Sequence, residues 1–112
     1  MELADYYNWF IQRLQKYQYN VNTSKYNLSW FSVFRSLSQQ QKIWWHLKTF
    51  GKVTTMDVEL IYFFPHPPGI IRDIRDKLKQ ERMDYAIGNV EKNGYTVWGK
   101  PCKYYEYTLE EL

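Results

Sequence analysis

The stretch that decides the fold is PGIIRDIRDKLKQ, which occupies positions 68–80. Its apolar residues recur at the spacing of one face of an α-helix, so the charged residues between them are carried to the other side. We therefore predict a helix over 69–83 with an apolar stripe facing a core and a basic face toward solvent. The stripe consists of Ile70, Ile71, Ile74 and Leu78, and the basic residues are Arg72, Arg75, Lys79 and Arg82.

A shorter helix is expected upstream, over 56–64. KVT at 52–54 has room for a very short strand, and the hydroxyl of Thr54 or Thr55 can cap the helix that follows. PHPPG at 65–69 should end this helix and impose a turn, because proline lacks an amide donor and fixes φ. The residues expected to face inward are Val58, Ile61 and Tyr62.

Two strands are expected downstream, where the hydrophobic period changes from helical to alternating. Tyr85 and Ile87 begin the first strand, and Asn93-Gly94 is a strong hairpin-turn signal. Residues 95–98 are expected to form the strand that returns after this turn. A break at 99–101 precedes a last strand over 102–109, and an acidic tail ends the chain. In that last strand, Tyr105 and Tyr107 should share one face, with Tyr104 and Glu106 on the other.

The N-terminal segment carries a separate helical pattern. Residues spaced alternately by four and three form one apolar seam along a helix of about four turns. This helix either packs on its own domain or mediates self-association as a homodimer. The seam consists of Leu3, Tyr7, Phe10, Leu14 and Tyr17.

A polar loop and two further helices should connect this segment to the strand at 52–54. The stretch 18–29 is rich in Asn, Ser and Thr and favours a loop. WFSVF at 30–34 is expected to be a short helix that brings aromatic rings to the core. Ser38 resembles a helix cap, and the helix it opens should continue to Gly51. The predicted organisation is an N-terminal helix and linker over 1–36 and a second domain over 37–112.

Composition limits the classes of function. The single cysteine, Cys102, rules out an intrachain disulfide and fits a reducing compartment. There is no secretory leader and no apolar run near the ~20 residues of a membrane span, so we predict a cytoplasmic protein with no membrane partner. His46, His66 and Cys102 are too scattered for a zinc site, and no catalytic or cofactor motif is present. We therefore expect neither an enzyme nor a metal or cofactor site.

The position of the charged residues along the chain is more informative about function than the net charge. The chain has 15 basic and 12 acidic residues, for a net charge of +3. The segment 70–104 contains eight basic and five acidic residues and so accounts for all of that charge. This segment is either a cationic binding surface or a solvated face of mixed sign.

The segment 51–109 resembles the small winged helix-turn-helix domains of phage and prophage proteins. The residues that carry the resemblance are GKVT at 51–54, IRDIRDKL at 71–78, DYAI at 84–87 and YTL at 107–109. The resemblance implies an α+β winged helix-turn-helix, with a three-helix core, a β-hairpin wing and an N-terminal helical extension. It also implies that the helix over 69–83 enters the major groove of double-stranded DNA and that the basic wing over 88–103 lies along the backbone.

In that arrangement the cations would have two roles. Arg72 and Arg75 would contact base edges, because the guanidinium fork can bond O6 and N7 of guanine together. The phosphate contacts would be Lys79, Arg82, Lys92, Lys100 and Lys103. The alternative is a purely structural ladder of ion pairs, such as Arg72 with Asp76 one helical turn later.

Two functions follow as expectations. The first is a small non-enzymatic DNA-binding protein, a phage or mobile-element transcription regulator acting in the bacterial host. The second is a protein-binding winged-helix module, a phage-encoded inhibitor or adaptor of a host protein, which would use exposed aromatic side chains. The aromatic anchors in that case would be Trp9, Trp45, Tyr95, Trp98 and Tyr104.

Overall fold

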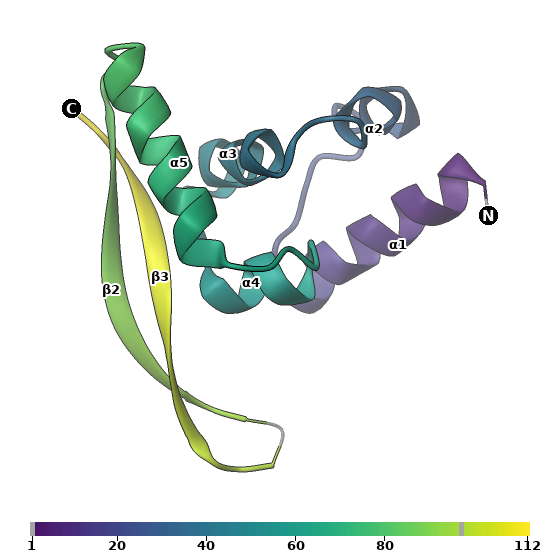
Figure 1. Ribbon diagram of the computed structural model, residues 1–112. Coiled ribbons are helices and arrows are strands. Elements are labelled where there is room, and N and C mark those ends of the chain that lie inside the picture. The colour runs from purple at the N-terminus through teal and green to yellow at the C-terminus, as the bar shows by residue number, and fades with distance from the viewer. Residues whose placement is uncertain (1, 97) are drawn as a thin grey trace. The chain divides into compact units, whose positions relative to one another are not determined.

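The computed structural model describes residues 2–96 and 98–112, and it shows the predicted α+β chain (Figure 1). The chain forms two compact units that divide after Ser38, whereas the sequence suggested a division after residue 36. The first unit contains α1 (Leu3–Lys16) and α2 (Leu28–Phe34). The second unit contains α3 (Gln39–Phe50), β1 (Lys52–Thr54), α4 (Thr55–Leu60), α5 (Pro67–Gln80), β2 (Tyr85–Tyr95) and β3 (Pro101–Glu111).

The first unit is a pair of helices joined by aromatic rings. The predicted helix of the seam is present as α1, and Tyr7, Phe10 and Leu14 are buried. The Tyr7 ring stacks on Phe31 of α2 with 5.6 Å between centroids, and the Phe10 ring lies 5.4 Å from Phe34. The centre of the seam is therefore covered by the unit's own aromatic residues, which leaves little of it exposed for a second copy.

The second unit has its core around the predicted stripe of α5. All four stripe residues are buried, and α5 contacts both α3 and β2. Tyr62, Phe64 and Met83 pack at the margin of this core. The core consists of Ile43, Leu47, Val53, Val58, Ile70, Ile71, Ile74, Leu78, Ile87 and Tyr107.

The sheet is antiparallel with strand order β1-β3-β2, so the last strand of the chain is central. β1 pairs with β3 only over residues 106–108, with Val53 opposite Tyr107. The β2–β3 ladder is much longer and runs from Tyr85 opposite Glu111 to Tyr95 opposite Pro101. The sheet thus has three strands only beside residues 106–108 of β3, and the hairpin continues toward its tip as two strands.

The predicted strand and cap before α4 are confirmed, but α4 ends earlier than expected. The Thr54 hydroxyl accepts from the Asp57 amide at 3.0 Å, and the Asp57 carboxylate accepts from the Thr54 amide at 2.9 Å. The helix stops at Leu60 instead of residue 64, because Phe63 adopts a left-handed conformation with φ of 55°. The Phe64 amide then donates to the Val58 carbonyl at 3.2 Å, which closes the helix end.

The predicted helix over 69–83 is displaced toward the N-terminus. α5 starts at Pro67, so two prolines expected in the turn lie in its first turn instead. Proline is tolerated there because the first amides of a helix have no acceptor within it. At the other end the helix stops at Gln80, and Arg82 turns the chain with φ of 50°.

The predicted hairpin turn at Asn93-Gly94 is wrong. Gly94 lies within β2 opposite Cys102, and the turn is at 96–100, where the Thr96 amide donates to the Lys100 carbonyl at 2.8 Å. A Cβ at Gly94 would lie 3.0 Å from the Tyr104 ring, so this glycine makes room for an aromatic ring on the strand. Consequently 95–98 does not form a returning strand, and Val97 lies outside the described residues. The return strand begins at Pro101 and includes Glu110 and Glu111, which were expected in a tail.

Candidate functional site

Three of the four predicted basic residues lie along one side of α5. Arg72, Arg75 and Lys79 are separated by three and four residues, which aligns them on a helix, and Arg82 lies two residues after its end. Lys79 and Arg82 are exposed, and both line the groove between α5 and β2. The basic side of α5 therefore faces the hairpin.

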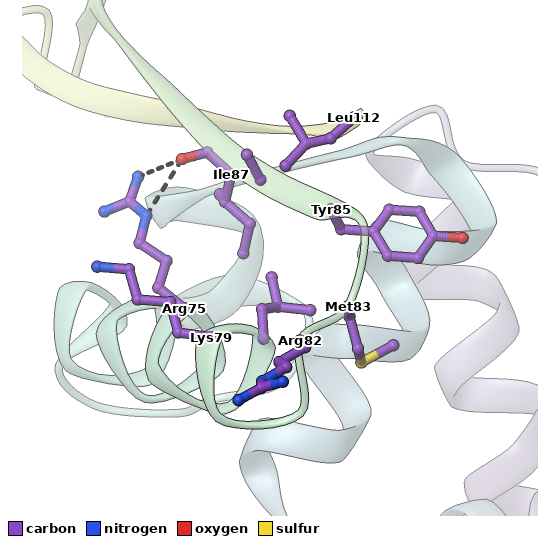
Figure 2. Close-up of a pocket in the computed structure, with 9 residues that line it drawn as sticks. Arg75, Lys79, Arg82, Met83, Tyr85, Ile87 and Leu112 are labelled. Atoms are coloured by element: carbon purple, nitrogen blue, oxygen red, sulfur yellow. Dashed lines mark hydrogen bonds between the residues drawn. The ribbon is translucent and has the colours of Figure 1, made fainter.

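Arg75 links α5 to β2 and is not a free cation. Its Nε and Nη2 donate to the carbonyl oxygen of Ile87 at 3.1 and 2.7 Å, and Nη2 also donates to Oδ1 of Asn89 at 3.2 Å. β2 is an edge strand, and Arg75 supplies donors to a carbonyl on it (Figure 2). Of the two arginines predicted to contact bases, the guanidinium of Arg75 is thus already engaged in the fold.

Arg72 is the other predicted base-contacting residue, and its side chain is 73% exposed. Its Nε lies 3.6 Å from the Asp73 carboxylate, so the pairing with Asp76 that we considered is replaced by one with its neighbour. An exposed pair of this kind contributes only about 0–1 kcal/mol, so it does not prevent Arg72 from contacting a ligand.

The outermost face of α5 carries charges of both signs, because Arg72 lies next to Asp76 there, one helical turn before it. Asp73, Asp76 and Gln80 recur at intervals of three and four residues opposite the buried stripe, and all three are exposed. Lys77 lies on the flank away from β2 and pairs with Glu81 at 3.5 Å. Of the cations of α5, Arg75 and Lys79 therefore line the groove beside the hairpin, whereas Lys77 lies on the other flank.

An open groove of about 330 Å³ separates α5 from β2 (Figure 2). Its lining is mainly apolar and includes Leu78, Met83 and Ala86. Lys79 and Arg82 also line it, and neither makes an ion pair within the described part of the chain. The groove is therefore an apolar channel bordered by cationic side chains.

The distal half of the hairpin is the second cationic region. The segment 92–104 contains three lysines and no acidic residue. Lys92 pairs with Glu106 at 3.8 Å, and Lys103 pairs with Glu91 at 3.1 Å. Lys100 is exposed in the turn and has no ion pair among residues 2–96 and 98–112.

The tip also exposes aromatic rings. Trp98 is 86% exposed and Tyr95 is 74% exposed, whereas Tyr104 is half-buried over Gly94. The other two predicted aromatic anchors are less accessible. Trp9 is partly exposed beneath the Arg13 guanidinium, 4.8 Å from its ring centroid, and Trp45 is half-buried.

The sequence pattern did not indicate that a titratable group lies in the core. His46 is fully buried, and its Nδ1 lies 2.7 Å from the Tyr62 hydroxyl oxygen. Removal from water lowers the pKa of His46 to about 3, so the imidazole is neutral at physiological pH. Burial also raises the pKa of Tyr107, an effect that the nearby Arg75 charge opposes.

Comparison of the chain with protein-family models, with curated proteins and with solved structures finds no match. Within the described residues, no group of three or more histidine, cysteine or acidic side chains could hold a metal ion. The helices described here are also all too short or too polar to cross a bilayer. The features of the molecule that bear on its function are therefore the two cationic regions and the exposed aromatic rings.

Proposed function

We propose that 39–112 is a winged helix-turn-helix domain and that it binds double-stranded DNA. The observation that carries the proposal is the pairing of two cationic regions, the basic side of α5 and the hairpin tip. Lys79, Arg82 and Lys100 are exposed and make no ion pairs within the described residues, so they can neutralise phosphates without first breaking a protein contact.

The placement of α5 relative to the hairpin supports a shared binding surface. β2 runs back along α5, so the hairpin tip projects past the end where α5 begins (Figure 1). A duplex lying along the basic side of α5 would then meet the hairpin as well. Because the outer face of α5 carries Asp73 and Asp76, the helix would approach DNA with its hairpin-facing side.

The proposed contacts follow from this orientation. Arg72 is the residue for base contact, because its guanidinium is exposed and held only by a surface ion pair. Lys79, Arg82 and Lys100 would contact phosphates. Lys92 and Lys103 would also do so after exchanging their ion pairs with Glu106 and Glu91 for phosphate oxygens. Arg75 acts indirectly by holding β2 against α5. The resemblance of 51–109 to small phage and prophage domains supports a non-enzymatic regulatory role.

The test is equilibrium binding to a fluorescent random-sequence duplex across a salt series. We expect dissociation constants on the order of 1–100 μM, typical of non-specific binding, and a steep loss of affinity as salt rises. Each of Lys79→Ala, Arg82→Ala and Lys100→Ala should weaken binding and reduce the slope of log K against log salt by about 0.9.

Lys77→Ala is the matched control. It removes the same charge from the same helix, but on the flank away from the hairpin. It should leave both the affinity and the salt slope close to those of the unmodified protein. An equal effect of Lys77→Ala and Lys79→Ala would show that the duplex responds only to net charge, and absence of binding at low salt would reject the DNA function altogether.

A second function is favoured by the exposed apolar side chains of the hairpin. Val90 and Tyr105 are exposed along its length, and Tyr95 and Trp98 are exposed at its tip. Aromatic side chains of this kind are the common anchors of protein interfaces. A protein that binds no nucleic acid at low salt would be assigned to this class, and the hairpin would be its docking element.

A further inference from the structure

We propose that the hairpin tip stacks the rings of Tyr95 and Trp98 on unpaired nucleobases, so that the protein prefers DNA in which a duplex adjoins a single-stranded stretch. This inference deepens the proposed function and rests on it for the duplex part of the ligand. It concerns the kind of DNA that is bound, which the basic side of α5 does not determine.

The first support is the accessibility of the two rings. With 74% and 86% of their surface exposed, Tyr95 and Trp98 are the most exposed aromatic residues in the described chain. Neither ring stacks on another ring or lies beneath a cation among residues 2–96 and 98–112. Both rings are thus accessible to a planar ligand, and every nucleobase offers a π face on which a ring can stack.

The second support is the hydrogen bonding among the described residues next to the two rings. The Thr96 hydroxyl oxygen accepts from the amides of Trp98 at 3.3 Å and Lys100 at 3.2 Å. Two backbone bonds, Thr96 amide to Lys100 carbonyl and Gly99 amide to Thr96 carbonyl, close the same turn at 2.8 and 2.9 Å. Because four hydrogen bonds join Thr96 to Trp98, Gly99 and Lys100, stacking on Trp98 would cost less entropy than it would on a side chain without such bonds beside it.

The third support is the sign of the charge around the rings. The segment 92–104 contains three lysines and no acidic residue, and Lys100 lies in the same turn as Trp98. Lys92 and Lys103 are paired with Glu106 and Glu91, so within the described residues Lys100 is the lysine of this segment that makes no ion pair. Aromatic rings beside such a cation are complementary to a chain that alternates planar bases with phosphates. A duplex buries the faces of its bases in the stack, so only unpaired bases can use both features.

The experiment measures binding to three labelled DNAs: a blunt duplex, a duplex with a single-stranded extension, and a single strand. We expect the extended duplex to bind about fivefold or more tighter than the blunt duplex. Trp98→Ala and Tyr95→Ala should each reduce that preference and leave affinity for the blunt duplex unchanged. Trp98→Phe, which keeps a ring, should retain most of the preference.

Tyr105→Ala is the matched control, because it removes an exposed aromatic ring from the same hairpin away from the tip. It should leave the preference intact. A second readout uses 2-aminopurine placed at the first unpaired position, whose fluorescence is quenched by stacking. The quenching should be lost in Trp98→Ala and kept in Tyr105→Ala.

The outcomes separate this inference from the proposed function. Salt-sensitive binding with equal affinity for blunt and extended duplexes overturns the inference alone, as does a preference that survives Trp98→Ala and Tyr95→Ala. Binding of the single strand without binding of the blunt duplex upholds stacking but rejects the duplex function. Failure to bind any of the three DNAs at low salt rejects both, and the tip is then assigned to a protein partner.

Discussion

The root and the tip of the β2–β3 hairpin belong to one continuous ladder, yet their environments are opposite. At the root, Ile87 and Tyr107 are buried in the core, with α5 and β1 as neighbours. At the tip, Tyr95 and Trp98 are the most exposed aromatic residues in the described chain. The same strand pairing therefore serves to complete a core at one end and to display side chains at the other.

The difference arises from what covers each half. β1 pairs with β3 only over 106–108, and the contacts of Arg75 reach β2 only at Ile87 and Asn89. Beyond Glu91 opposite Tyr105 the hairpin has two strands, and side chains there gain little from burial. Stability should thus depend on the root, and ligand binding should depend on the tip.

The largest expected effect comes from a core substitution at the root. Ile87→Ala should lower the free energy of unfolding by about 2–5 kcal/mol, because it removes buried methyl groups and leaves a cavity. Tyr95→Ala at the tip should change it by less than about 0.5 kcal/mol. Urea denaturation followed by far-ultraviolet circular dichroism measures both, and similar losses at the two sites would contradict the division between root and tip.

The next effect concerns the link between α5 and the root. Arg75→Ala should cost about 1–2 kcal/mol of unfolding free energy, because the carbonyl of Ile87 loses its charged donor and the apolar stem of Arg75 is removed. Arg72→Ala deletes the same side chain from an exposed position on the same helix and should have almost no effect on stability. Equal destabilisation by the two substitutions would show that Arg75 contributes only charge.

A smaller effect should appear as a pH dependence that originates in the core. Burial lowers the pKa of His46 from 6.5 to about 3, so the unfolded chain takes up a proton that the folded chain does not. Stability from this group is complete above pH 6.5 and falls as the pH drops toward 3. At pH 5.5 the loss should be about 1.3 kcal/mol relative to pH 7.

Denaturation midpoints at a series of pH values test this assignment. His46→Gln should remove this component of the pH dependence, because an amide does not titrate in this range. Tyr62→Phe removes the hydroxyl that lies 2.7 Å from Nδ1 but keeps the imidazole, so the component should persist. If His46→Gln loses as much stability between neutral pH and pH 5.5 as the unmodified protein does, another group is responsible for the pH dependence.

The smallest effect on global stability is expected for a substitution whose cost is local to the tip. Gly99 has φ of +77°, so Gly99→Ala should strain the turn by about 1–2 kcal/mol. Since the tip can open without unfolding the root, the cost should appear as faster hydrogen exchange of the Thr96 amide, by roughly five- to thirtyfold. Trp98→Ala is the control without a backbone constraint, and a lowered global midpoint in Gly99→Ala would show that root and tip unfold together.

The features that could be predicted from sequence are those set by neighbouring residues. The stripe of Ile70, Ile71 and Ile74 follows from helical spacing alone, and all three residues are buried. The short strand before Thr54 and the cap at Thr54 also depend on residues only a few positions apart, and both are present. These predictions succeeded because helix periodicity and capping are properties of the local chain.

The hairpin turn could not be predicted in the same way. Asn93-Gly94 has the composition of a tight turn, but register against β3 places both residues within β2. That register is set by the pairing of β3 with two strands at once and by the Tyr104 ring lying over Gly94. A sequence signal for a turn was thus overridden by contacts between residues distant along the chain.

The sequence by itself determined which helices form, which faces of them are buried and which segment is cationic. Only the tertiary structure decided that Arg75 is engaged by β2 while Arg72 is exposed, because the acceptor of Arg75 lies 12 residues away on another element. It also decided that Tyr95 and Trp98 stand at an uncovered tip. Periodicity reports the direction of a side chain relative to its own element, whereas its exposure depends on what the rest of the chain places against it.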